Sequence, residues 1–165
     1  MKNKTFKQLS GLILLLAIVG VVLYVAKIGD NKPAPNKTQE EAVNASDTKS
    51  IKIGDTIIDA ILAQTPEERA QGLSGRPNLP PNTGMLFLFP EPGTYAFWMK
   101  DMLFNIDMIW ISADRKIVYI EKNATPESYP KAFGPKDPAM YVLEVPAGFS
   151  DEHGLEEGDA VQFIK

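Results

Sequence analysis

A tryptophan and a lysine two residues apart are the first side chains in this sequence that could contact a ligand. In Phe97-Trp98-Met99-Lys100, strand alternation places Phe97 and Met99 on one face and Trp98 and Lys100 on the other. If the first pair points into the core, a tryptophan beside a cation remains on a wetter face, where it suits stacking on a sugar ring or holding an anionic group. The alternative is that Trp98 covers the edge of the core while Lys100 pairs with a neighbouring aspartate.

Two carboxylates within apolar strands are the second candidate for chemistry. Asp107 lies in Asn-Ile-Asp-Met-Ile-Trp and Glu144 in Tyr-Val-Leu-Glu-Val. A buried carboxylate has to be paired or hydrogen-bonded, because leaving it alone costs several kcal/mol. An ion pair from Asp107 to Lys100 or Arg76 is the structural interpretation. If Asp107 and Glu144 instead faced each other about 5–9 Å apart, they would resemble the acid pair of a glycosidase.

The remaining polar residues exclude more chemistry than they suggest. Arg76, in a Gly-Arg-Pro loop, could contact a ligand or brace the loop through backbone carbonyls. His153 has no neighbouring Ser or Cys nucleophile, which favours a structural role. The sequence contains no phosphate loop, dinucleotide fingerprint, nucleophile elbow or calcium loop. With no cysteine and one histidine, thiol catalysis, iron–sulfur clusters and His-rich metal sites are excluded, so we expect neither a metal nor a cofactor.

Charge is divided unevenly along the 165-residue chain. Residues 1–49 hold seven Lys against four acidic residues, whereas residues 50–165 hold ten Lys or Arg against seventeen Asp or Glu. An acidic folded part argues against nucleic acid as a partner, because phosphate binding relies on basic patches. Residues 50–165 are enough for one domain with a single core.

Short strands dominate the pattern of residues 50–165. Runs of β-branched and aromatic residues bounded by turn residues predict strands at 51–53, 56–63, 85–89, 95–100, 106–111, 117–121, 141–145 and 160–164. We expect Gly84 to serve the turn before a core strand and residues 123–138 to form an irregular loop. Such a series of short strands predicts a mainly β domain, either an antiparallel β-sandwich or a partly closed barrel.

One or two short helices should interrupt these strands. Thr65 can cap a helix, Pro66 suits its first position, and Glu68 completes a capping box. Gly72 permits the left-handed conformation that ends such a helix. A further helical turn is expected at residues 150–153.

An apolar segment precedes the domain. After a basic flank at residues 1–8, the uncharged run 9–26 would measure roughly 27 Å as a helix, close to the thickness of a thin bilayer core. We therefore expect a single transmembrane helix that keeps the N-terminus cytoplasmic by the positive-inside rule. A cleaved signal peptide, giving a secreted protein, is the alternative; the run is longer than its usual apolar region, and bulky Tyr24 precedes the best cleavage site at Ala26.

A polar linker then separates this anchor from the domain. Residues 27–49 contain few large apolar side chains, which predicts a disordered tether. The globular domain at 50–165 would accordingly lie outside the cell membrane, in the periplasm or on the cell surface.

A known family shares much of this pattern. The string GLSGRPNLPPNTGMLFLFPEPGTYAFWMKDMLFNIDMIWISADRKIV, residues 72–118, resembles domain-of-unknown-function family 192 of bacteria and archaea. The preceding TPEERAQGL and the closing YVLEVPAGFSDEHGLEEGDAVQF are similar to it as well, so the resemblance spans about residues 51–165. Asn105 stands where the family usually has proline. The resemblance implies a compact, mostly β domain, often behind an export or anchor segment, and implies no established activity.

Three functions are compatible with these residues. The favoured one is a membrane-tethered extracytoplasmic binding module for an envelope glycan, a polymer or a protein partner, with candidate site residues Arg76, Trp98, Lys100, Asp107 and Glu144. A hydrolase using Asp107 and Glu144 is the second, and a purely structural envelope protein is the third. Convergence of the two carboxylates would favour the hydrolase, and full burial of Trp98 would favour the structural protein.

Overall fold

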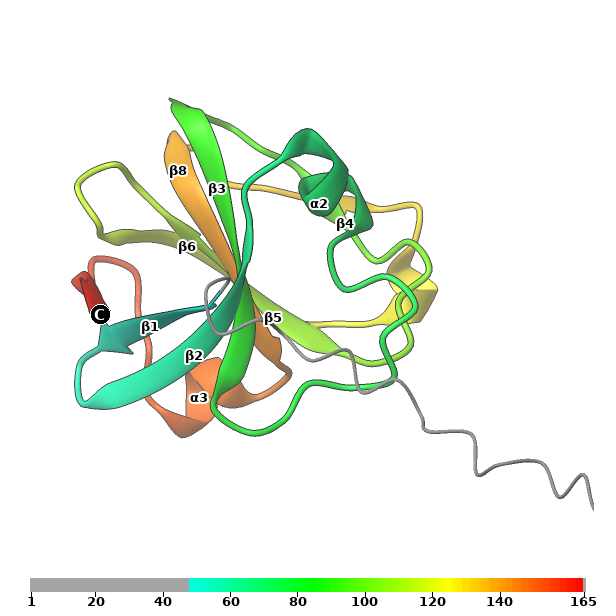
Figure 1. The fold of residues 1–165 in the computed structure, drawn as a ribbon, viewed down its shortest axis with the longest axis horizontal. Coiled ribbons are helices and arrows are strands. Elements are labelled where there is room, and N and C mark those ends of the chain that lie inside the picture. Colours follow the sequence, from blue (N-terminus) through cyan, green and yellow to red (C-terminus); the bar gives the residue numbers. More distant parts are fainter. Residues whose placement is uncertain (1–47, 165) are drawn as a thin grey trace, which may run out of the picture. The chain divides into compact units, whose positions relative to one another are not determined.

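A seven-stranded sheet organises residues 48–164, the part of the chain that the computed structural model describes (Figure 1). In spatial order its strands are β6 Ile117–Ala124, β5 Ile106–Ile111, β8 Ala139–Pro146, β3 Thr83–Gly93, β2 Thr56–Ala63, β1 Thr48–Ile53 and β9 Val161–Ile164. The shorter elements are α2 Pro66–Gln71, a two-stranded pair of β4 Phe97–Trp98 with β7 Ala132–Phe133, the 3-10 turn Pro126–Ser128, and α3 Phe149–Glu152. The prediction of a mainly β domain with two short helices is confirmed.

The sheet curls until its outer strands, β6 and β9, meet at one end. Lys116 and Ala160 form a bridge. Next to it, the Ile117 N–H donates to the carbonyl of Asp159 at 3.0 Å, and the Gly158 N–H donates to the carbonyl of Ile117 at 2.8 Å. The result is a half-barrel, so of the two predicted architectures the structure has the partly closed barrel.

One neighbouring pair of strands in the large sheet is parallel, unlike the antiparallel arrangement that was expected. β2 and β3 run in the same direction, with Ala60 beside Gly84 and Leu62 beside Leu86. Parallel neighbours need a crossover connection, and residues 64–82, which include α2, provide it. Gly84 itself lies inside β3 and is buried, not in the preceding turn where it was expected.

The start of α2 is the predicted capping box. The Thr65 hydroxyl accepts the N–H of Glu68 at 3.1 Å, while the Glu68 carboxylate accepts the N–H groups of Thr65 and Gln64 at 2.8 and 2.7 Å. These backbone donors hold the pKa of Glu68 below its ordinary value. The helix ends at Gly72, which has a φ of 50°. Local sequence therefore determines both ends of α2.

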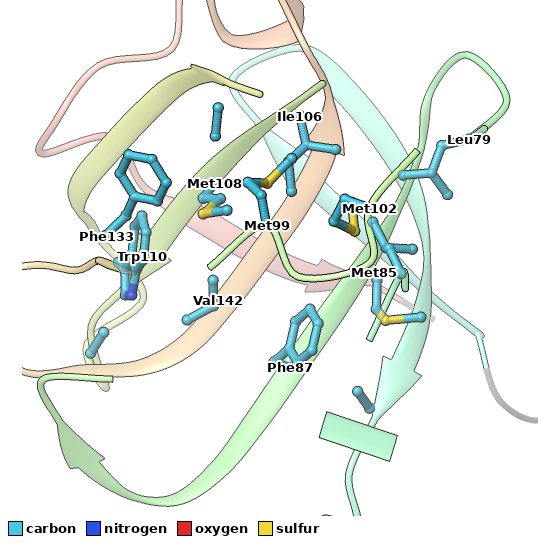
Figure 2. Packing of buried hydrophobic residues seen from close by; sticks show 14 residues of the cluster. Leu79, Met85, Phe87, Met99, Met102, Ile106, Met108, Trp110, Phe133 and Val142 are labelled. Atoms are coloured by element: carbon cyan, nitrogen blue, oxygen red, sulfur yellow. The ribbon is translucent and has the colours of Figure 1, made fainter. Parts of the chain in front are cut away.

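Apolar side chains fill both faces of the central strands. One layer, the pocket-side core, contains Ala63, Leu73, Leu79, Met85, Phe87, Met99, Met102, Ile106, Met108, Trp110, Ala124, Phe133, Ala139 and Val142 (Figure 2). The other layer, the far-side core, contains Ile51, Ile53, Ile58, Ala60, Leu86, Ile109, Ile111, Ile117, Leu143, Val145, Phe149, Leu155 and Val161. Every residue of β5 is buried, so its successive side chains enter the two layers alternately.

The predictions for the N-terminal region fall outside the described residues. This applies to the flank at 1–8, the transmembrane segment at 9–26 and nearly all of the linker at 27–49, of which the last two residues belong to β1. Within residues 48–164, no helix is long and apolar enough to cross a membrane.

Candidate functional site

A pocket of about 230 Å³ opens between α2, β3 and the β4 segment. Its lining consists of residues 69–74 from α2 and the following turn, Phe87 and Phe89 from β3, residues 95–98, Met102, and Glu144 from β8. The lining shares Leu73, Phe87 and Met102 with the pocket-side core, so the pocket borders this layer. Figure 1 shows α2 and β4, which contribute to the lining, on the same side of the sheet.

Aromatic rings form most of the apolar wall. Phe97 meets both Phe87 and Phe89 edge-to-face, with ring centroids 4.8 and 6.4 Å apart, so neighbouring walls stand at right angles. Tyr95 stacks on Phe89 with 3.6 Å between centroids. The indole N–H of Trp110 in the core donates to the carbonyl of Tyr95 at 2.8 Å and fixes this segment from below. The walls are therefore positioned by the fold.

Glu144 is the acidic group of this pocket. Its side chain is only 4 % exposed, and its register neighbours on β3 and β5 are Met85 and Met108. Among the described residues no group hydrogen-bonds to its Oε2 atom. Burial away from water raises the pKa of Glu144 from the ordinary 4.5 to about 8, so the carboxyl is mostly protonated at neutral pH in the free protein. An unpartnered buried acid in a cavity is a functional-site candidate.

Trp98 stands at the mouth of the pocket with 57 % of its surface exposed. The predicted alternation is confirmed, since Met99 is buried and Trp98 and Lys100 are exposed. Lys100 is not part of the lining. Its backbone carbonyl accepts the Ser74 hydroxyl at 2.9 Å, which ties the β4 segment to the turn after α2. Of this predicted pair, only the tryptophan borders the cavity.

Asp107 and Glu144 do not converge. The two strands pair so that Asp107 lies beside Val145 while Glu144 lies beside Met108. Because successive side chains point to opposite faces, Asp107 belongs to the face of the far-side core and Glu144 to the face of the pocket. A glycosidase-like pair of these two carboxylates is therefore not formed.

Asp107 serves instead as an acceptor for backbone groups. Its Oδ1 atom accepts the N–H groups of Asn123 and Gly148 at 2.8 and 3.2 Å, and its Oδ2 atom accepts the N–H of Ser150 at 2.8 Å. Three backbone donors satisfy the fully buried carboxylate, where the sequence favoured an ion pair to Lys100 or Arg76. The side chain thereby joins the end of β6 to the first turn of α3.

Arginine borders the pocket at a position that the sequence did not single out. Arg76 is not in the lining, whereas Arg69 of α2 is. The Arg69 guanidinium donates to the carbonyls of Gln64 and Leu88 and lies 5.3 Å from the centroid of the Phe89 ring. These bonds fasten α2 to β3 and hold the guanidinium against the wall of the pocket.

Several pocket residues were not predicted from the sequence, because the local pattern around them gives only a weak indication of a site. Phe87 and Phe89 alternate along β3, within the segment 85–89 that was predicted to be a core strand. Phe87 is buried, whereas Phe89 is only half-buried. Tyr95 and Phe97 alternate in the same way before Trp98. Alternation alone could have grouped these rings on one face, but only the placement of α2 over them makes a pocket. In residues 48–164 no cluster of acidic or histidine side chains could hold a metal ion.

The fold and the pocket together define a small half-barrel β domain with a buried acid inside an aromatic cavity. The chain belongs to the family DUF192, described as "Uncharacterized ACR", whose sequence profile matches residues 49–163. The resemblance seen in residues 72–118 is thereby confirmed.

This chain is similar to curated proteins and to solved structures. A UPF0127 protein of Thermococcus sibiricus is 30% identical over 118 residues, which cover 70% of this chain and 67% of that protein. A crystal structure from Novosphingobium aromaticivorans, of unknown function, matches with a TM-score of 0.65, 29% identity and coverage of 70% of this chain and 83% of that chain. Another, from Sinorhizobium meliloti, is named as a candidate transcription regulator and matches with a TM-score of 0.67 and 31% identity, covering 70% of this chain and 93% of that one.

Proposed function

We propose that this chain is a membrane-tethered extracytoplasmic binding module whose aromatic pocket receives one ring of a cell-envelope glycan. The observation that carries the proposal is the buried Glu144, which lines an aromatic cavity with its Oε2 atom unpartnered among the described residues. A polar group buried without a partner is costly. A ligand hydroxyl or similar group would recover that cost, whereas an apolar ligand would not.

The exposed Trp98 supports a ring-shaped ligand. An aromatic face that is more than half exposed at a pocket mouth can cover the flat apolar face of a sugar while Glu144 bonds to a polar group deeper in the cavity. Ligand pockets commonly combine such apolar walls with a few placed polar groups. The volume of about 230 Å³ admits a single small ring, so the pocket would bind one sugar unit of a longer polymer.

The other functions that the sequence allowed have less support. A hydrolase using Asp107 and Glu144 would need both carboxylates at one site, and they occupy opposite faces of the sheet. A purely structural role would be favoured by a fully buried Trp98, which is exposed instead. Nucleic acid is a poor partner for residues 50–165, because their acidic side chains outnumber the basic ones by seventeen to ten.

The apolar run at residues 9–26 supports the proposed tethering. With a basic flank before it and a polar segment after it, this run would hold the pocket-bearing domain near the outer face of the membrane. A domain held there meets envelope polymers at high local concentration, so weak binding to each ring would suffice.

The proposal is tested by measuring binding with the full chain in lipid nanodiscs. Sugars and oligosaccharides of envelope glycans would be titrated while the melting temperature is recorded, because a ligand at 100 times its Kd adds about 2.7 kcal/mol of stability. We expect at least one glycan to raise the melting temperature. Trp98→Ala should abolish this shift while leaving the melting temperature without ligand unchanged.

The matched control is Leu103→Ala, which removes another large exposed apolar side chain (62 % exposed) that does not line the pocket. This variant should keep the full response to the glycan. Equal loss of binding in both variants, or no response of the parent chain to any glycan of the panel, would contradict the proposed function.

A further inference from the structure

The charge preference of the pocket can be inferred from the groups around Glu144. Its neighbours across the strands are the apolar side chains of Met85 and Met108. The other ionisable side chains of the lining are Arg69 and Tyr95, and both are bonded elsewhere. Arg69 donates to two backbone carbonyls, and the Tyr95 hydroxyl donates to the carbonyl of Glu91 at 2.7 Å. The cavity therefore contains an acid that forms no ion pair with any side chain of the described residues.

The aromatic walls favour the same kind of ligand as this acid. The face of an aromatic ring carries negative electrostatic potential, which attracts a cation placed over it. Phe97 stands nearly perpendicular to Phe87 and Phe89, at interplanar angles of 88° and 82°, and all three rings line the cavity. The Arg69 guanidinium, 5.3 Å from the centroid of the Phe89 ring, shows that an aromatic ring of this wall already contacts a cation. A ligand cation in the cavity would lie among these rings and near the Glu144 carboxyl group.

From these two observations we propose that the ligand ring carries a protonated amine, which is held between the Glu144 carboxylate and the aromatic walls. This inference rests on the proposed function of the pocket and specifies the substrate class as an amino sugar with a free amine. A neutral sugar would satisfy Glu144 as a hydrogen-bonding group but would leave the attraction of the rings for positive charge unused. An anionic sugar would meet an acid and no uncommitted cation in the lining.

Binding of an amine has a consequence for protons that binding of a neutral sugar lacks. In the free pocket the Glu144 carboxyl is protonated up to a pH of about 8, because burial raises its pKa. An ammonium group stabilises the charged carboxylate, so binding below this pH expels the proton. Affinity for the amine should then rise by up to tenfold for each pH unit between pH 5.5 and 7. A neutral sugar would leave the proton in place, and its affinity would be flat over this range.

The test uses two ligands that differ only at the nitrogen. The full chain in nanodiscs would be titrated calorimetrically at pH 6.5 with a glucosamine trisaccharide and with its N-acetylated counterpart, in two buffers of different ionisation enthalpy. We expect at least tenfold tighter binding of the free amine and release of up to one proton for each ligand bound. Glu144→Gln should remove both the preference and the proton release. Its fold is checked by the fluorescence of the buried Trp110, and the proton count of the parent chain stands even if this variant fails to fold.

Two results would overturn the inference, and they differ in what they leave standing. If the acetylated sugar binds as tightly as the amine, or the amine binds without releasing a proton, the amine assignment is wrong and the glycan-binding function survives. If neither sugar binds and no other envelope glycan shifts the melting temperature, the proposed function fails as well.

Discussion

The backbone carbonyl of Glu144 lies so close to Gly84 that a Cβ atom on this glycine would stand 2.7 Å from it. Gly84 is buried inside β3, and its φ lies outside the left-handed region, so the glycine is required for space and not for a turn. The missing side chain lets β3, which carries Phe87 and Phe89, approach the strand that carries Glu144. One contact thus sets the spacing between the aromatic wall and the acid.

Replacing Gly84 by alanine should destabilise the domain. The added methyl group would displace the backbone of β8, and overpacking of this kind typically costs about 1–3 kcal/mol. Urea unfolding followed by the fluorescence of Trp110 would measure the loss. Gly134→Ala is the matched control, because its Cβ atom would meet its nearest neighbour, the Tyr95 carbonyl, at an ordinary 3.4 Å. If Gly84→Ala is as stable as this control, β3 and β8 leave room for a methyl group at this position in solution.

Stability should fall as the pH rises, because of Glu144. Its pKa is raised from 4.5 to about 8 on folding, so the folded state binds more protons than the unfolded state between these values. The stabilisation is complete below pH 4.5 and decreases by up to roughly 1 kcal/mol for each pH unit until pH 8. Unfolding free energies of the parent chain and of Glu144→Gln, measured from pH 5 to 8.5, should diverge, with the variant relatively more stable at high pH. Parallel curves would show that the carboxyl is not buried unpaired.

Most of the fold could be predicted because its signals are local. Each predicted strand has its own run of β-branched and aromatic residues and its own turn residues, and the capping box of α2 occupies four consecutive positions. The exposed position of Trp98 was predicted for the same reason, because strand alternation depends only on the residues next to it in the chain. The pairing of β4 with β7 was missed, because two-residue strands leave no periodic pattern in the sequence.

The candidate site could be predicted only in part, because it depends on how distant segments align. Glu144 joins the pocket through its register with Met85 and Met108, and Asp107 faces away through its register with Val145. The donors to Asp107 come from residues 16, 41 and 43 positions later in the chain. No local pattern indicates such alignments, so two carboxylates that looked equivalent in sequence have different surroundings.

Asp107→Asn should destabilise the fold without acting on the pocket directly. An amide retains one oxygen acceptor but turns an NH₂ group toward a backbone donor, so at least one hydrogen bond to Asn123, Gly148 or Ser150 is lost. Hydrogen bonds to charged groups contribute about 1.5–3 kcal/mol each, and urea unfolding should show a loss of this order.

Asp151→Asn provides the comparison for this change. Asp151 pairs with Lys122 at the surface, where its side chain is 72% exposed, and its removal should have little effect. If Asp107→Asn is as stable as the parent chain but no longer binds a glycan, Asp107 takes part in ligand binding and its role is not only structural.

Thr65→Ala should loosen the helix that borders the pocket. The Thr65 hydroxyl caps α2 by accepting the Glu68 N–H, and loss of such a cap typically costs about 1 kcal/mol. Because Arg69 fastens this helix to the carbonyl of Leu88 at 3.0 Å, fraying would reach the wall of the pocket.

Amide hydrogen exchange should therefore become faster at Glu68 and Arg69 than in the parent chain, with a smaller change in β5. The control is Thr94→Ala, which alters an exposed threonine of the β3–β4 connection and should leave the exchange rates of Glu68 and Arg69 unchanged. Unaltered exchange in Thr65→Ala would mean that packing of α2 on β3, and not its cap, holds this wall in place.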